Sequence, residues 1–190
     1  MKTTSLILTF LGAVVHTAWC CSLPTTCAEA SATKPGDYKV YLGPKFTPVT
    51  VFCNDGKEYI TLKAKNFGDN ICERNWPQCG RTEWTKIRLD PKTMTVIGTD
   101  YTYSTSTTNV KVPYGQGGGC KGKGAVSGTF ALDLTGTPFS FDASKVKWKA
   151  DGFHPASVAS VNKDDPKKAS GQCGGDCGYC NPIGNIALIV

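Results

Sequence analysis

The ten cysteines among 190 residues are the feature that most restricts how this chain can fold. Cytosolic proteins rarely keep so many thiols, whereas exported proteins use paired cysteines to brace folds with limited cores. The cysteine count therefore predicts an oxidising compartment and a disulfide scaffold. The pairing of these cysteines does not follow from the sequence, because many connectivities are compatible with one set of positions.

An export signal accounts for residues 1–22. Lys2 precedes an apolar run at 5–15, and Ala18 and Cys20 are small residues of the kind found near cleavage sites. That run is too short to cross a bilayer, which takes about 20 residues. The later apolar stretch at 183–190 is shorter still and predicts a buried last strand. We expect a secreted, extracellular domain at 23–190 with no membrane span.

The cleavage point decides how many cysteines the mature protein keeps. A cut after Cys20 leaves nine, and the odd Cys21 could then link two chains in a disulfide dimer. A cut after Ser22 leaves eight, which can all pair in four disulfides. These eight are Cys27, Cys53, Cys72, Cys79, Cys120, Cys173, Cys177 and Cys180.

The hydrophobic pattern is typical of an all-β protein. Short runs rich in Val, Ile, Thr, Tyr and Phe are separated by turn-forming residues. Residues 155–161 could form one short helical turn, and the glycine-rich segment 115–124 is expected to be a mobile loop. The pattern predicts a single disulfide-stapled sandwich or barrel of roughly ten short strands. The runs lie at 38–42, 49–53, 59–64, 86–89, 94–97, 100–104, 109–112, 128–134, 139–142, 145–149 and 186–190.

Three cysteines crowd into the segment 173–180, and three kinds of chemistry use such spacing. They could be zinc ligands, the C-x-x-C of Cys177 and Cys180 could be a redox dithiol, or all three could form disulfides. His154 is the only histidine beyond the signal, and no helix or βαβ pattern accompanies the C-x-x-C. We therefore expect disulfides and no cofactor or metal.

Motifs for catalysis are missing from the sequence. It contains neither the H-E-x-x-H of zinc proteases nor the G-x-S-x-G of serine hydrolases. Asp164 and Asp165 lie together in a lysine-rich turn, which is typical of a solvated loop. We expect no catalytic residues. A carboxylate-based enzyme is the open alternative, because the sequence does not show which acids meet in space.

The net charge of +6 favours an anionic partner. Lys145, Lys147 and Lys149 alternate with apolar residues and so share one face of a predicted strand, while Lys121 and Lys123 lie in the glycine-rich segment. Outside the cell, such a surface meets sulfated glycan or acidic protein. The competing interpretation is that these lysines keep the sheet soluble and protect an edge strand. Nucleic acid is not expected, because interleaved aromatic and basic motifs are missing.

Several segments, taken in order, resemble the GON domain, the C-terminal module of a subset of ADAMTS extracellular metalloproteases. The order is kept over about 27–190, and the last segment is the most specific. The segments are CAE at 27–29, GDY at 36–38, PVTVFC at 48–53, EYITL at 58–62, KIRLD at 86–90, VPY at 112–114, GTFALDL at 128–134 and GQCGGDCGYC at 171–180.

The resemblance implies an extracellular module and not a protease, since no position here matches a catalytic motif of that family. In the full-length proteases the domain is thought to serve matrix association or secretory transport. The resemblance therefore implies a secreted, non-catalytic module that binds extracellular matrix or a cell-surface partner. The alternatives are a carboxylate-based extracellular enzyme and a structural or secretory-pathway helper.

Overall fold

The structure is a computed structural model that describes residues 22–72, 79–121 and 126–190. Within these ranges it contains twelve β-strands and no helix, and four disulfides brace them. The prediction of an all-β, disulfide-stapled fold is confirmed. No helix of the described ranges is long and apolar enough to cross a membrane.

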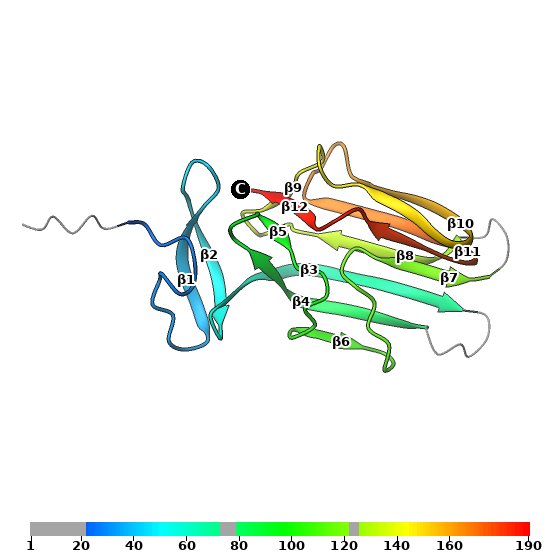
Figure 1. The fold of residues 1–190 in the computed structure, drawn as a ribbon, viewed down its shortest axis with the longest axis horizontal. Coiled ribbons are helices and arrows are strands. Elements are labelled where there is room, and N and C mark those ends of the chain that lie inside the picture. The colour runs from blue at the N-terminus through cyan, green and yellow to red at the C-terminus, as the bar shows by residue number, and fades with distance from the viewer. Residues whose placement is uncertain (1–21, 73–78, 122–125) are drawn as a thin grey trace, which may run out of the picture.

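The strands belong to one hydrogen-bonded sheet whose main path runs β10-β11-β7-β3-β4-β5-β12-β9 (Figure 1). The hairpin of β1 and β2 joins this path at β3, β6 pairs with β4, and β8 pairs with both β3 and β11. The strands are β1 (Gly36–Leu42), β2 (Thr47–Asn54), β3 (Lys57–Cys72), β4 (Gly80–Asp90), β5 (Thr95–Val96), β6 (Ser104–Ser106), β7 (Gly117–Cys120), β8 (Val126–Asp133), β9 (Ser140–Phe141), β10 (Trp148–Val161), β11 (Lys168–Pro182) and β12 (Ile186–Ile189).

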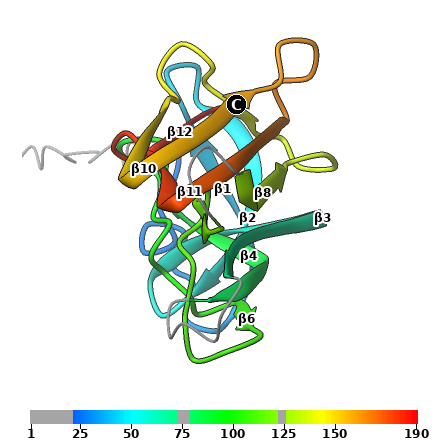
Figure 2. The same ribbon diagram turned by 90° about the vertical axis from the view of Figure 1, so that its right-hand side faces the viewer.

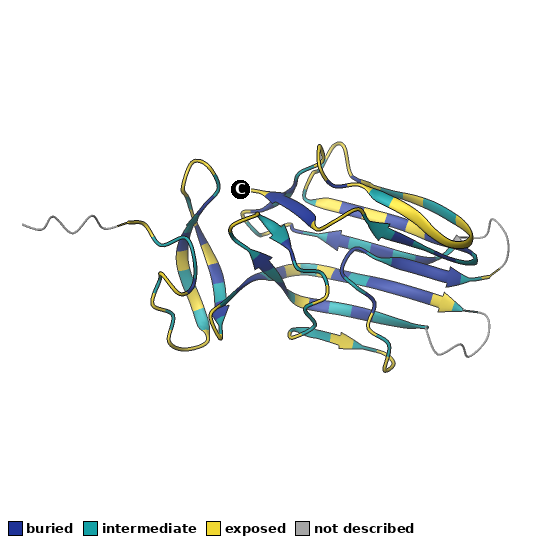
Figure 3. Ribbon diagram, viewed as in Figure 1, coloured by how far each residue is buried: buried dark blue, intermediate teal, exposed yellow. Residues whose placement is uncertain are grey.

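The sheet curls, so that its two ends approach each other. The backbone N–H of Phe141 in β9 donates to the carbonyl of Pro166, just before β11, at 2.8 Å. Seen from the end, β8, β10 and β11 lie above β3, β4 and β6 (Figure 2). Apolar side chains at alternate positions of the strands, such as Val49 and Val51 of β2, are buried in a single hydrophobic core. Figure 3 shows that exposed positions gather on β10.

Several local predictions are wrong. The runs predicted as strands at 100–104 and 109–112 are turn and loop, apart from Ser104, which begins β6. Residues 155–161 are part of β10, because they pair with β11 along their whole length instead of forming a helical turn. The glycine-rich segment contains β7, which is buried, and not only a loop. Glycine is required there because the neighbouring backbones touch: a Cβ on Gly128 would overlap the carbonyl of Gly118. Residues 122–124 of the predicted loop lie outside the described residues.

The cysteine-rich segment 173–180 makes β11 fold back on itself. The Cα atoms of Cys173 and Cys180 are 5.4 Å apart, whereas seven residues of extended strand would span about 23 Å. Gly174 and Gly175 have positive φ angles, which glycine adopts without strain. The first part of β11 therefore pairs with β8, and the part after the bend pairs with β7.

All eight cysteines of the described ranges are joined in disulfides. The C-x-x-C cysteines are not joined to each other: Cys177 pairs with Cys120 and ties the bend to the end of β7, while Cys180 pairs with Cys173. The other two disulfides are Cys27–Cys53 and Cys72–Cys79. The described residues contain no group of three or more His, Cys, Asp or Glu side chains placed to hold a metal ion.

Candidate binding site

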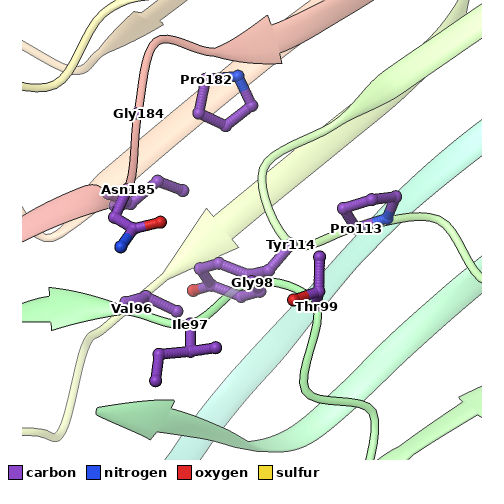
Figure 4. A pocket seen from close by; sticks show the side chains of 10 residues that line it. Val96, Ile97, Gly98, Thr99, Pro113, Tyr114, Pro182, Gly184 and Asn185 are labelled. Carbon is purple, nitrogen blue, oxygen red and sulfur yellow. The ribbon is translucent and has the colours of Figure 1, made fainter. Parts of the chain in front are cut away.

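A small cavity of about 150 Å³ lies between the β5 region and the segment that leads into β12 (Figure 4). The only lining side chain that titrates is Tyr114, whose hydroxyl donates to Asn66 Oδ1 at 2.8 Å and whose pKa is raised by burial. The cavity therefore offers mainly apolar contact. Its lining residues are Val96, Ile97, Gly98, Thr99, Pro113, Tyr114, Pro182, Gly184, Asn185 and Ile186.

A carboxylate-based enzyme needs two carboxylates that face each other. In the structure, the carboxylates of Asp69 and Glu83 both contact the side chain of Arg81. The guanidinium of Arg81 contacts Asp69 at 3.1 Å and Glu83 at 2.7 Å. Burial raises the pKa of Asp69, and the charge of Arg81 opposes that rise. In the lysine-rich turn, Asp165 pairs with Lys168 at 3.1 Å. Each of these three carboxylates thus has a cationic partner.

The predicted lysine segment is exposed as expected from its alternation. Val146 is buried, and Trp148 stacks on Phe130 with ring centroids 5.2 Å apart. The intervening Lys145, Lys147 and Lys149 are exposed, although β10 begins only at Trp148. Lys145 pairs with Asp142 and Lys149 with Asp151, each at 3.1 Å, so two of the three ammonium groups are partly neutralised.

The structure does not bring all the predicted lysines together. Lys121 is exposed at the end of β7, where its backbone N–H donates to Gly175 in the bend of β11. Lys145 lies beside Leu188 and Ile189, near the C-terminus at the other end of the sheet (Figure 1). Lys123 lies outside the described residues.

A polar cleft opens where β2 and β3 separate. Their pairing extends from the turn to Phe52 and Tyr59 and ends there. Beyond that point the two strands border a cavity of about 320 Å³, which we term the β2–β3 cleft. Its lining residues are Asp37, Pro48, Val49, Thr50, Ile60, Thr61, Lys63, Gly136, Thr137 and Pro138.

Three lysines from three strands lie in this cleft or on the strands next to it. Lys63 lines it, Lys39 of β1 is paired with Thr50 of β2, and Lys86 of β4 is paired with Thr61 of β3. Paired residues of neighbouring antiparallel strands present their side chains on the same face of a sheet. None of these three lysines forms an ion pair within the described residues. The three lysines are distant from one another in sequence, so no local motif marks them.

A cluster of aromatic rings beside the cleft holds Lys86 in place. The ammonium of Lys86 lies 4.6 Å from the ring centre of Phe52 and 4.9 Å from that of Tyr103. Tyr103 in turn packs edge-on against Tyr59, with ring centroids 4.9 Å apart. Contacts of a cation with ring faces are attractive, so the position of this ammonium is defined before any ligand arrives.

Asp100 ties this cluster to β4. It accepts hydrogen bonds from Tyr59 Oη at 3.3 Å and Arg88 Nη1 at 3.5 Å. Burial raises the pKa of Asp100, but hydrogen bonds from Thr102, Tyr59 and the charge of Arg88 outweigh burial and hold the pKa below its usual value. The charged form of Asp100 therefore stabilises the folded state.

The Asp100→Asn variant is expected to lose about 1–2 kcal/mol of unfolding free energy at pH 7. A lowered folded-state pKa contributes stability above the unfolded pKa, and this contribution is lost as the pH falls through the folded value. The difference from the unsubstituted protein should therefore shrink as the pH falls below about 4, the ordinary pKa of an aspartate. Urea unfolding from pH 2 to pH 7 measures this. Asp164→Asn, at an exposed turn, is the control, and a pH-independent difference for Asp100→Asn contradicts the explanation.

Comparison with known proteins finds one family and several relatives. The family model described as GON domain matches residues 63–190. The chain is 28% and 29% identical over 195 residues to the mouse and human proteins named "A disintegrin and metalloproteinase with thrombospondin motifs 20". It is 26% identical over 193 residues to the Caenorhabditis elegans protein named "A disintegrin and metalloproteinase with thrombospondin motifs gon-1". The matches cover 84–85% of this chain but only 9–10% of each relative. No solved structure matches.

Proposed function

The chain belongs to the GON domain family, and we propose that it is a secreted, non-catalytic binding module. Its partner is extracellular matrix or a cell-surface component, either a sulfated glycan or an acidic protein. The protease activity in the relatives' names is not part of the proposal, because the matches cover only about a tenth of each relative.

The observation that carries the proposal is a set of exposed cationic side chains on a braced β-scaffold. Lys145, Lys147 and Lys149 are exposed while Val146 between them is buried, so this short segment presents three ammonium groups to solvent. Cationic surfaces attract polyanions and raise their local concentration. The four disulfides keep such a surface folded in an oxidising environment and limit the cost of ordering it on binding.

The variant in which Lys145, Lys147 and Lys149 are all changed to Ser tests the contribution of this segment. We expect earlier elution from heparin and a roughly threefold loss of affinity, because exposed ion pairs contribute about 0.2–1 kcal/mol each and two of these lysines already face aspartates. The measurement is the salt concentration at elution. Asp142→Asn, which frees Lys145 from its partner, is the opposite control and should elute later. Unchanged elution of the triple variant contradicts a role for this segment.

A further inference from the structure

We propose that the β2–β3 cleft is a binding subsite for a sulfated polysaccharide chain, whose sulfate groups are met by Lys39, Lys63 and Lys86. This inference rests on the proposed binding function. It adds the class of ligand and the place on the fold where the ligand binds.

The register of four strands sets the geometry of the subsite. Lys39 and Thr50 pair across β1 and β2, while Thr61 and Lys86 pair across β3 and β4. Continuing the register of Phe52 with Tyr59 would bring Thr50 opposite Thr61, but the strands do not pair there and the cleft lies between them. Lys39 therefore lies on the β2 side of the cleft and Lys86 on the β3 side. Each is one strand spacing, about 4.8 Å, from the threonine with which it is paired. Lys63 lies two residues along β3 from Thr61, on the same face of that strand.

The charges of this subsite are available to a ligand. Lys39 and Lys63 are exposed, and neither has an acidic partner within the described ranges, in contrast to Lys145 and Lys149. The ammonium of Lys86 already lies against two aromatic rings, so this side chain loses little conformational entropy when a ligand binds. Lysine ammonium groups are compact point charges, which suits them to sulfate groups that are presented at varying angles along a chain.

The walls of the cleft favour a saccharide over a peptide. A peptide partner depends on apolar anchors that fill pockets, but the apolar side chains of Val49 and Ile60 are buried here. The wall carries the hydroxyls of Thr50 and Thr61 and main-chain groups with no strand partner across the opening. Asp37, the one carboxylate among the lining residues, can accept a hydrogen bond from a sugar hydroxyl, a group that a saccharide carries beside its sulfates.

The test is calorimetric titration of the intact secreted protein with a heparin hexasaccharide. The Lys39→Ser/Lys63→Ser/Lys86→Ser variant should bind about 10- to 100-fold more weakly, as expected for the loss of three cation–sulfate contacts. The matched control is Lys92→Ser/Lys111→Ser/Lys163→Ser, which removes the same charge from three exposed turns or loops and should lose no more than about threefold. An N- and O-desulfated hexasaccharide should bind as weakly as the cleft variant does.

Equal losses in the two triple variants would show that only overall charge matters and would overturn the subsite. Equally tight binding of an acidic peptide of the same charge would overturn the saccharide assignment. Amine acetylation of the unsubstituted protein, with and without hexasaccharide, gives a result that does not depend on how the variants fold. Lys39, Lys63 and Lys86 should be protected, and protection of Lys92, Lys111 and Lys163 alone contradicts the proposal. If the protein binds matrix but not the hexasaccharide, the subsite fails and the proposed function stands; if it binds neither, both fail.

Discussion

The Asn66→Ala variant is expected to lose about 4 kcal/mol of unfolding free energy, because one buried amide satisfies four hydrogen bonds. Asn66 lies where β3 bulges out of its pairing with β4, between Thr61 and Asn66. Its side chain replaces the lost strand contacts. Nδ2 donates to the carbonyls of Asp133 at 2.8 Å and Ala64 at 3.1 Å, while Oδ1 accepts from Asp133 N and Tyr114 Oη, each at 2.8 Å.

Alanine at this position leaves the backbone groups of Asp133 and the hydroxyl of Tyr114 without these partners in the interior. Each buried polar group left unpaired costs about 1–3 kcal/mol, which is why the expected loss exceeds that of an ordinary hydrogen-bond deletion. For a domain of this size the loss corresponds to a fall in Tm of roughly 8–16 °C.

Denaturant unfolding and thermal unfolding both measure the loss, with Tyr114→Phe as the matched control. That control removes a single hydrogen bond to the same amide and should cost about 1 kcal/mol. A loss for Asn66→Ala no larger than that of Tyr114→Phe would show that the network around the bulge does not support the fold.

Replacing Cys120 and Cys177 with alanine is expected to cost about 4 kcal/mol of unfolding free energy. These two cysteines are 57 residues apart in sequence, the longest separation among the four disulfides. A cross-link over a long loop removes more conformational freedom from the unfolded chain than one over a short loop. This disulfide also ties the bend of β11 to β7. The paired strands β10 and β11 are therefore expected to loosen near the bend when the disulfide is absent.

The matched control is the double alanine variant of Cys72 and Cys79, which are only seven residues apart. The chain-entropy relation gives about 2 kcal/mol for this pair. Urea unfolding of both variants, followed by tryptophan fluorescence, compares the two losses directly. Equal losses, or a larger loss for Cys72 and Cys79, would contradict loop closure as the source of stability.

The β-strands with strong alternation could be predicted from the sequence. The runs at 38–42, 49–53 and 128–134 fall within β1, β2 and β8 or extend one residue past them, because branched and aromatic side chains there pack on a half-buried sheet. The glycine-rich β7 and the folded β10–β11 ribbon could not be predicted. Their residues have weak strand propensity, and contact between neighbouring backbones keeps them in the sheet.

The residues of the candidate site also divide into those that could be predicted from the sequence and those that could not. Alternation was enough to predict that Lys145, Lys147 and Lys149 would be exposed. The cleft lysines follow from strand register instead, since Lys39 and Lys86 become neighbours of one opening only when β2 and β3 separate. The acidic partners of Lys145 and Lys149 lie only three and two residues away in the sequence, but this spacing alone does not show that the charges meet.

The central claim is that this domain binds extracellular matrix without changing it. Titration of labelled protein onto decellularised matrix tests this most directly, when the matrix proteins and glycans are sized by mass before and after incubation. We predict saturable binding that unlabelled protein competes away and that weakens as salt rises, with the sizes of the matrix polymers unchanged. The contradicting result is the absence of saturable binding together with the appearance of shortened matrix polymers.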